Sequence, residues 1–263
     1  MTAHIPRKRF GQHFLVDHSV ISKILDAVAP QPADVVLEIG PGLGALTGPL
    51  LGRLPCLHVV EIDRNIVAML RERWHSEQLV IHQGDALAFD LATLGPRLRV
   101  VGNLPYNVST PLLFHIAAHA SVIVDGHFML QKEVVDRMVS PPGRGEYGRL
   151  SVMLQYRFRM QRLFDVAAGS FNPPPKVRSA VVRMIPLAQA VCPRARDEGL
   201  MGRLVAQAFS RRRKTLRNAL EGFLDEAGIR EAGLDPGARA ETVDVDGFVR
   251  AADAALRRLP GAG

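Results

Sequence analysis

Residues 35–45 read VVLEIGPGLGA, an apolar run that leads into three alternating glycines. Glycine lets the backbone turn tightly and approach a ligand closely, and the helix start that follows such a loop offers free N–H groups. The spacing Gly40-x-Gly42-x-x-Ala45 fits a dinucleotide-binding loop, and Glu61 lies about 20 residues further on, where an acid holds the ribose. The loop and Glu61 together predict a cofactor that contains adenosine, of either the nicotinamide or the adenosylmethionine type.

Similar β-branched runs recur along the chain, separated by amphipathic stretches that are mostly long enough for a helix. The expected strands are residues 35–39, 57–62, 79–82, 98–101 and 122–130. This alternation is typical of a Rossmann-like α/β fold, in which helices cover both faces of a doubly wound, mostly parallel sheet. Such sheets bind ligands at the carboxyl ends of their strands, so we expect the site in the loops that follow these runs.

The fourth run ends in the quartet Asn103-Leu104-Pro105-Tyr106. The Asn103 amide and nearby backbone carbonyls can accept hydrogen bonds from an amino group on a flat heterocycle, and the Tyr106 ring can stack on that heterocycle. The alternative is an ordinary strand end, which Pro105 closes and where Tyr106 is half-buried. In a parallel sheet the quartet opens onto the same edge as the glycine loop, which favours a nucleobase clamp.

Two aspartates follow other strands of the expected sheet. Asp85, after the third run, can accept a hydrogen bond from the amino group of the cofactor adenine, or can cap the next turn. Asp63 lies where a helix N-cap is needed, and we assign it that role rather than ribose binding.

The net charge of +7 is unevenly distributed along the 263 residues. Residues 31–130 contain 6 Lys/Arg and 9 Asp/Glu, whereas residues 131–186 contain 10 Lys/Arg and 4 Asp/Glu. Polyanions bind by exchanging their counterions for Lys and Arg, so this basic segment indicates nucleic acid as partner. The run Arg211-Arg212-Arg213-Lys214 is either a solvated helix face or a phosphate site.

Composition also restricts the compartment and the chemistry. Cys56 and Cys192 are too few for a disulfide framework, and their spacing suggests no metal site. The basic first residues lead into no apolar signal segment, and no later run is long enough to span a membrane. We therefore expect a cytoplasmic protein with no metal and no membrane partner.

The chain is expected to form two domains. Residues 1–186 hold a basic arm, in which Arg7 to Leu15 precede a helix capped by Asp17, and the α/β domain; residues 187–263 are expected to form a smaller, all-helical domain. Near the end of the first domain, residues 171–177 form a proline-rich loop that is expected to present Phe171 like a finger.

With these motifs in order over residues 9–185, the chain resembles the rRNA adenine N6-dimethyltransferase family, in particular its bacterial small-subunit (16S) branch. The motifs that carry the resemblance are GQHFL (11–15), EIGPGLG (38–44), VEID (60–63), GDA (84–86), NLPYN (103–107) and FNPPPKVRS (171–179). His13 departs from the pattern, because the family often has Asn at this position.

The resemblance implies a class I S-adenosylmethionine-dependent methyltransferase. It implies that the cofactor is bound by six residues: His13, Leu15, Gly40, Glu61, Asp85 and Asn103. It further implies that Asn103 and Pro105 orient the target amino group, and that Tyr106 and Phe171 hold the base. The implied substrate is a pair of neighbouring adenosines in a hairpin loop near the 3′ end of 16S rRNA, within immature 30S subunits, and the 187–263 domain would bind this rRNA. A monomer is expected.

Three other functions are compatible with parts of the pattern. A resistance-type methyltransferase acting on large-subunit rRNA would use the same chemistry. A ribosome-assembly factor would bind immature small subunits, with methylation a secondary activity. A nicotinamide-dependent oxidoreductase would explain the glycine loop, but not the basic segment or the Asn103 quartet.

Overall fold

The computed structural model describes residues 13–188 and 194–258. The sequence features assigned to Arg7–Gln12 and to Cys192 lie outside these ranges. The chain divides into two compact units: the first holds the chain up to Val135 together with Arg159–Pro186, and the second holds Asp136–Phe158 and the described residues from Leu187 on. Within the described residues, none of the helices has the length and apolar character that a bilayer span requires.

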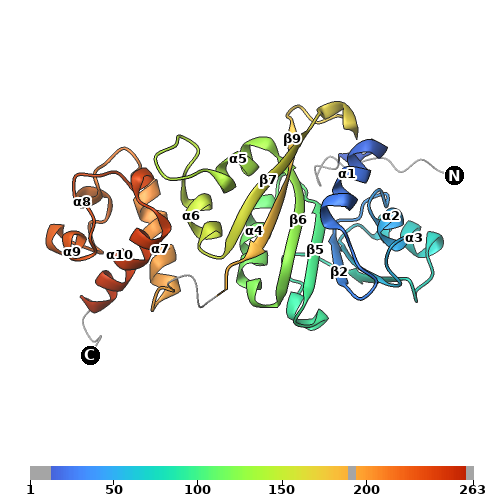
Figure 1. Cartoon of the computed structure of the whole chain (residues 1–263), viewed down its shortest axis with the longest axis horizontal. Helices are drawn as coiled ribbons and strands as arrows, with labels where there is room; N and C mark the ends of the chain where they lie inside the picture. Colours follow the sequence, from blue (N-terminus) through green and yellow to red (C-terminus); the bar gives the residue numbers. More distant parts are fainter. Residues whose placement is uncertain (1–12, 189–193, 259–263) are drawn as a thin grey trace. The chain divides into compact units, whose positions relative to one another are not determined.

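The first unit is built on a seven-stranded sheet with the order β4-β3-β2-β5-β6-β9-β7 (Figure 1). Five strands are parallel: β2 Val35–Ile39, β3 Leu57–Glu61, β4 Leu79–Gln83, β5 Leu98–Asn103 and β6 Ile123–Gln131. These are the five strands expected from the sequence, with shifts of one or two residues at some ends. β9, Ser179–Pro186, runs antiparallel to β6, and β7, Phe158–Val166, forms the edge beyond it. β9 was not expected, although its β-branched, fully buried Val181 and Val182 are typical of a strand in the interior of a sheet.

Helices cover both faces of the sheet. The chain passes from β2 to β3 and β4 on one side, and from β5 to β6 on the other, so the connecting helices lie on opposite faces. The helices α1 His18–Val28, α2 Thr47–Leu51 and α3 Arg64–Arg73 share one hydrophobic core. α4, Ser109–Ala118, connects β5 to β6, and right-handed crossovers place it on the opposite face. Asp17 caps α1 by accepting from the backbone nitrogens of Ser19 and Val20, and Asp63 caps α3 in the same way, as the sequence predicts.

One further helix and several 3-10 helices lie between these elements or in the second unit. They are α5 Lys132–Val139 and the 3-10 helices η2 Leu91–Leu94, η3 Ala120–Val122, η4 Ala168–Ser170 and η5 Ala240–Thr242.

The arm before α1 joins the proline-rich loop in a small second sheet. β1, Phe14–Leu15, pairs antiparallel with β8, Phe171–Asn172, so that Leu15 lies opposite Phe171. Phe171 is only 3% exposed and belongs to the core under α1. The prediction that Phe171 projects as a finger is therefore wrong, because burying its ring beside Leu15 removes a large apolar surface from water.

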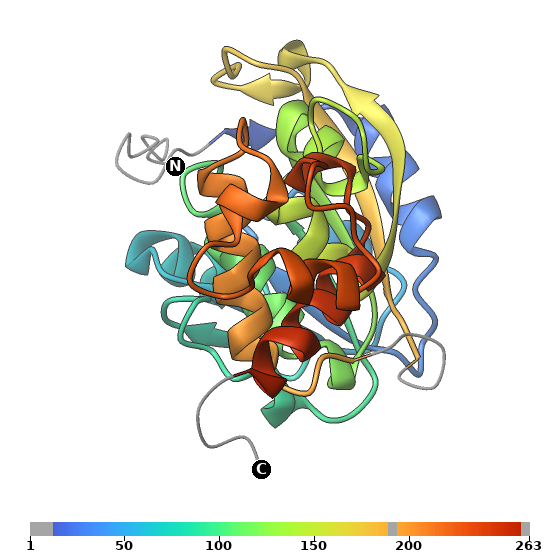
Figure 2. The same ribbon diagram turned by 90° about the vertical axis from the view of Figure 1, so that its left-hand side faces the viewer.

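The second unit is helical, with α6 Arg149–Gln155, α7 Glu198–Ser210, α8 Leu216–Ala219, α9 Glu226–Glu231 and α10 Val245–Arg257. Figure 2 shows α7 to α10 in orange and red, gathered in one cluster. The expected division at residue 187 coincides with a boundary between the units, but Asp136–Phe158, expected in the first domain, belongs to the helical unit. The reason is packing: Tyr147 is fully buried in the helical core and its hydroxyl donates to the Val243 carbonyl over 2.9 Å.

The close approach of β5 to β2 depends on Gly102. A Cβ at this position would lie 2.6 Å from the Ile39 carbonyl oxygen, which is backbone and cannot move aside without distorting the sheet. Gly102→Ala should lower the free energy of unfolding by about 1–3 kcal/mol, measured by urea denaturation. Gly169→Ala is the matched control, because a Cβ there meets nothing within 4 Å. Equal effects of the two substitutions would contradict this account of the sheet.

Candidate active site

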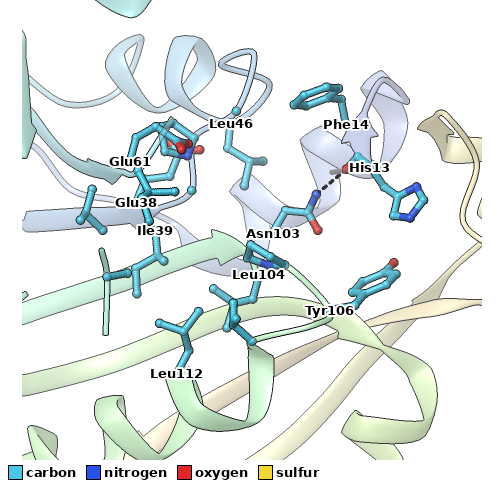
Figure 3. A pocket seen from close by; sticks show the side chains of 18 of the residues that line it. His13, Phe14, Glu38, Ile39, Leu46, Glu61, Asn103, Leu104, Tyr106 and Leu112 are labelled. Carbon is cyan, nitrogen blue, oxygen red and sulfur yellow. Dashed lines mark hydrogen bonds between the residues drawn. The ribbon is translucent and has the colours of Figure 1, made fainter. Parts of the chain in front are cut away.

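A cavity of about 360 Å³ opens at the carboxyl ends of β2, β3 and β5, within the first unit (Figure 3). Its volume is in the range of small-molecule sites. The cavity is lined by most of the residues that the sequence singles out: His13, Leu15, Gly40, Glu61, Asp85, Asn103, Pro105 and Tyr106. Phe171 does not line it. The structure therefore brings together eight of the nine expected site residues.

The glycine loop has the backbone that only glycine adopts without strain. Gly40, Gly42 and Gly44 have φ values of 67°, 55° and 85°. A Cβ at Gly42 would approach the Phe14 ring to 3.1 Å, whereas a Cβ at Gly40 would meet nothing within 4 Å. At Gly40 it is therefore the conformation alone that requires glycine.

Two carboxyl groups lie in the cavity wall with little access to water. Glu61 is 7% exposed and accepts from the Asp63 backbone nitrogen over 2.8 Å; burial raises its pKa. Glu38 is 2% exposed and accepts a hydrogen bond of 2.7 Å from the Thr47 hydroxyl. Burial raises the pKa of Glu38 to about 7, opposed in part by Thr47. No role was assigned to Glu38 from the sequence, although a carboxyl group inside an apolar strand is itself a signal of function.

Asp85 combines the two roles that its sequence position allows. Its Oδ1 accepts from the Leu87 backbone nitrogen over 2.9 Å and so caps the next turn. The residue is exposed and lines the cavity, so Oδ2 is available to a ligand.

The amide of Asn103 is oriented by the arm. Its Nδ2 donates a hydrogen bond of 3.0 Å to the backbone carbonyl of His13. Figure 3 shows the amide oxygen pointing away from that carbonyl, towards Tyr106. Because a carbonyl only accepts, this bond identifies the nitrogen end of the amide and leaves the oxygen as an acceptor in the cavity. Leu15, two residues after His13, is 5% exposed and packs into the core, so its backbone is the part available to a ligand.

Tyr106 is held from the central sheet. Its hydroxyl forms a hydrogen bond of 2.5 Å with the hydroxyl of Ser179, the fully buried first residue of β9, and burial raises the pKa of the phenol. The ring lies 5.6 Å from the His13 ring, centroid to centroid, with 32° between the planes. Ser179 ends the FNPPPKVRS motif, but no role was assigned to it from the sequence, because a serine in a strand gives no indication of a partner 73 positions away.

The sequence model of the family described as ribosomal RNA adenine dimethylase matches residues 3–255. The chain belongs to this family. It is 61% identical to the ribosomal RNA small subunit methyltransferase A of Aromatoleum aromaticum, over 95% of this chain and 94% of that protein. It is also 61% identical to the protein of the same name from Laribacter hongkongensis, over 95% of each chain.

Two solved structures of related enzymes share the fold over nearly the whole chain. A dimethyladenosine transferase from Plasmodium falciparum is 27% identical with a TM-score of 0.76, covering 91% of this chain and 96% of that chain. The 23S rRNA methyltransferase ErmE is 25% identical with a TM-score of 0.69, covering 92% and 98%. The expected class I methyltransferase fold with a helical C-terminal part is confirmed, and the oxidoreductase alternative is excluded.

As a member of this family the chain is an rRNA adenine dimethyltransferase, and its methyl donor is S-adenosylmethionine. The cavity fits this cofactor: the glycine loop allows close backbone approach, and the buried carboxyl groups of Glu38 and Glu61 favour a ligand with a positive charge. A cation brought into the cavity stabilises the ionised form of both groups.

The raised pKa of Glu38 predicts a pH-dependent affinity for the cofactor. Because burial raises the pKa of Glu38 to about 7, we expect binding of the sulfonium cation below pH 7 to release a proton from this carboxyl group. The association constant should therefore rise with pH, by up to about tenfold between about pH 6 and pH 8, as measured by titration calorimetry. S-Adenosylhomocysteine, whose sulfur is neutral, should show a smaller rise.

The matched variant is Glu38→Gln, which can still accept from Thr47 but does not titrate. In this variant the difference in pH dependence between the two ligands should disappear. An unchanged difference would show that Glu38 is not the group whose ionisation is linked to binding.

Proposed function

We propose that the chain transfers methyl groups to N6 of two adjacent adenosines in a hairpin loop near the 3′ end of 16S rRNA, giving N6,N6-dimethyladenosines. The observation that carries this proposal is the Asn103 amide, which presents its oxygen to the same cavity that the glycine loop and Glu61 line. The two relatives with 61% identity, both named small subunit methyltransferase A, support the choice of 16S rRNA. We infer that the chain acts as a monomer, in the cytoplasm, on immature 30S subunits.

The cavity residues divide between the two ends of the cofactor. Gly40 lies at the methionine end, Glu61 accepts from the ribose hydroxyls, and Asp85 Oδ2 accepts from the adenine amino group. Leu15 contacts the cofactor through its backbone, since its side chain is in the core. His13 also acts through its backbone, because its carbonyl orients the Asn103 amide at the cavity.

The residues of the quartet act by orienting the target nitrogen. An adenine amino group is a poor nucleophile because its lone pair is delocalised into the ring. The Asn103 amide oxygen and the Pro105 carbonyl accept its two hydrogens, which draws the nitrogen towards tetrahedral geometry and directs its lone pair at the methyl group. S-Adenosylmethionine supplies that methyl group on a sulfur that is already a good leaving group. Alignment therefore performs most of the catalysis, and the quartet contains neither His nor Glu.

A base in a duplex cannot reach this cavity, so the target adenosine must be unpaired or flipped, with its ring stacked on Tyr106. Once N6 has accepted a methyl group it carries a positive charge and loses one proton to water, so only one hydrogen remains on N6. The second transfer therefore proceeds with one of the two acceptor contacts given up.

The substrate is tested by incubating the protein with labelled S-adenosylmethionine and immature 30S particles, 50S particles or free rRNA. Label in 30S particles alone supports the proposal. Label in 50S particles would favour the large-subunit alternative, for which the fold shared with the 23S rRNA methyltransferase ErmE is the supporting observation. Tight 30S binding without transfer would favour an assembly factor.

Asn103→Ala should abolish methyl transfer, because the oriented acceptor is lost. It should leave the affinity for S-adenosylmethionine within about tenfold of wild type, a change of about 1.4 kcal/mol. Single-turnover transfer and calorimetry measure the two effects. Asn218→Ala, an exposed amide in the second unit, is the matched control. Near-normal turnover of Asn103→Ala would rule out the clamp.

The basic run in the second unit lies in the turn after α7, and its four members differ in their contacts. Arg211 pairs with Glu221 over 3.1 Å and Arg212 with Glu241 over 2.8 Å. Arg213 and Lys214 are exposed and have no charged partner among the described residues. We assign Arg213 and Lys214 to phosphate contacts with rRNA, and the second unit to rRNA binding.

Replacing Arg213 and Lys214 together by Gln should reduce the slope of log affinity against log salt by between about 1 and 2 units, measured on 30S particles by filter binding. Arg230→Gln, which removes a cation already paired with Glu226, should leave the slope unchanged. If the double variant keeps the wild-type slope, the run is a solvated surface.

A further inference from the structure

A purine held in the cavity exposes two faces, and Tyr106 covers one of them. The other was expected to meet Phe171, but that ring is buried in the core. A base with one face open to water loses about half of its possible stacking contact, so the opposite face needs another planar group.

The ring that lies opposite Tyr106 is the imidazole of His13. The two centroids are 5.6 Å apart and the planes differ by 32°, so the rings are closer to parallel than to perpendicular. Both residues line the cavity, and Figure 3 shows the two rings one above the other beside the Asn103 amide oxygen. If the amino group of a base reaches the Asn103 amide oxygen, the ring of that base therefore points towards the His13 and Tyr106 rings.

Both rings are held by their edges from one segment of chain, residues 173–179. His13 Nδ1 donates a hydrogen bond of 2.8 Å to the Pro173 carbonyl, and the Tyr106 hydroxyl bonds to Ser179 over 2.5 Å. Contacts at the edges leave the ring faces available for stacking. The segment ties both rings to one end of the sheet, because Ser179 begins β9, which pairs with β6.

The His13 and Tyr106 rings are slightly too close together for a base to be inserted between them. Two stacking contacts of about 3.5 Å each require roughly 7 Å between the rings, whereas the centroids are 5.6 Å apart. The rings must therefore separate by about 1.5 Å, a shift of the size that side-chain adjustments on binding provide.

We propose that the His13 imidazole forms the second face of the base clamp, so that the target adenine is inserted between His13 and Tyr106, an inference that rests on the proposed function. The backbone of His13 orients Asn103 while its side chain covers the base. The recognised group is an unpaired purine.

Two variants of His13 separate stacking from loop positioning. His13→Asn can still donate to the Pro173 carbonyl but has no ring, whereas His13→Phe has a ring but no donor. With unmethylated 30S particles and labelled S-adenosylmethionine, we expect kcat/KM for the particles to fall roughly tenfold in His13→Asn and to stay within roughly twofold of wild type in His13→Phe. The Kd for S-adenosylmethionine, measured by calorimetry, should change little in either variant.

The controls are His18→Asn, an exposed histidine at the start of α1, and Tyr106→Ala. His18→Asn should behave as wild type and Tyr106→Ala should lose transfer. Wild-type kcat/KM in His13→Asn, or an equal loss in His13→Asn and His13→Phe, would overturn the role of the imidazole. If Tyr106→Ala also retained wild-type activity, both the role of the His13 imidazole and the stacking on Tyr106 in the proposed function would be wrong.

Discussion

The hydrogen bond from the Asn103 amide nitrogen to the His13 carbonyl decides which end of that amide faces the cavity. The bond exists only when the arm is docked, and docking depends on a short set of contacts with the proline-rich loop. β1 pairs with β8, the Val16 backbone nitrogen donates to the Ser170 carbonyl, and the Ser170 hydroxyl donates to Asp17. The orientation of the Asn103 amide is therefore a property of three distant segments folded together, rather than of the quartet alone.

Another part of the cavity wall contains the buried carboxyl group of Glu38. Glu38 lies in the interior with one hydroxyl donor, and burial makes its ionised form costly in the free protein. A cationic cofactor relieves that cost, whereas a product with a neutral sulfur relieves less of it. We therefore expect Glu38 to favour S-adenosylmethionine over its demethylated product.

The sequence predicted those features that depend on local pattern and on parallel topology. The strands are short apolar runs, and because the carboxyl ends of parallel strands meet at one edge, Gly40, Glu61 and Asn103 were expected to meet there and do. Contacts between distant segments carry no such local signal. The burial of Phe171 beside Leu15, the Ser179 anchor of Tyr106 and the packing of Tyr147 into the helical core each require a partner at least 70 positions away. Pairings at that distance depend on the folded sheet and core, and the periodicity of one sequence does not reveal them.

The most direct test is a crystal structure of the protein with S-adenosylhomocysteine and an RNA carrying the target adenosine. The account predicts the adenine N6 within about 3 Å of both the Asn103 amide oxygen and the Pro105 carbonyl, with the amide nitrogen still on the His13 carbonyl. An N6 that contacts neither acceptor, or an Asn103 released from His13 in the complex, would contradict it.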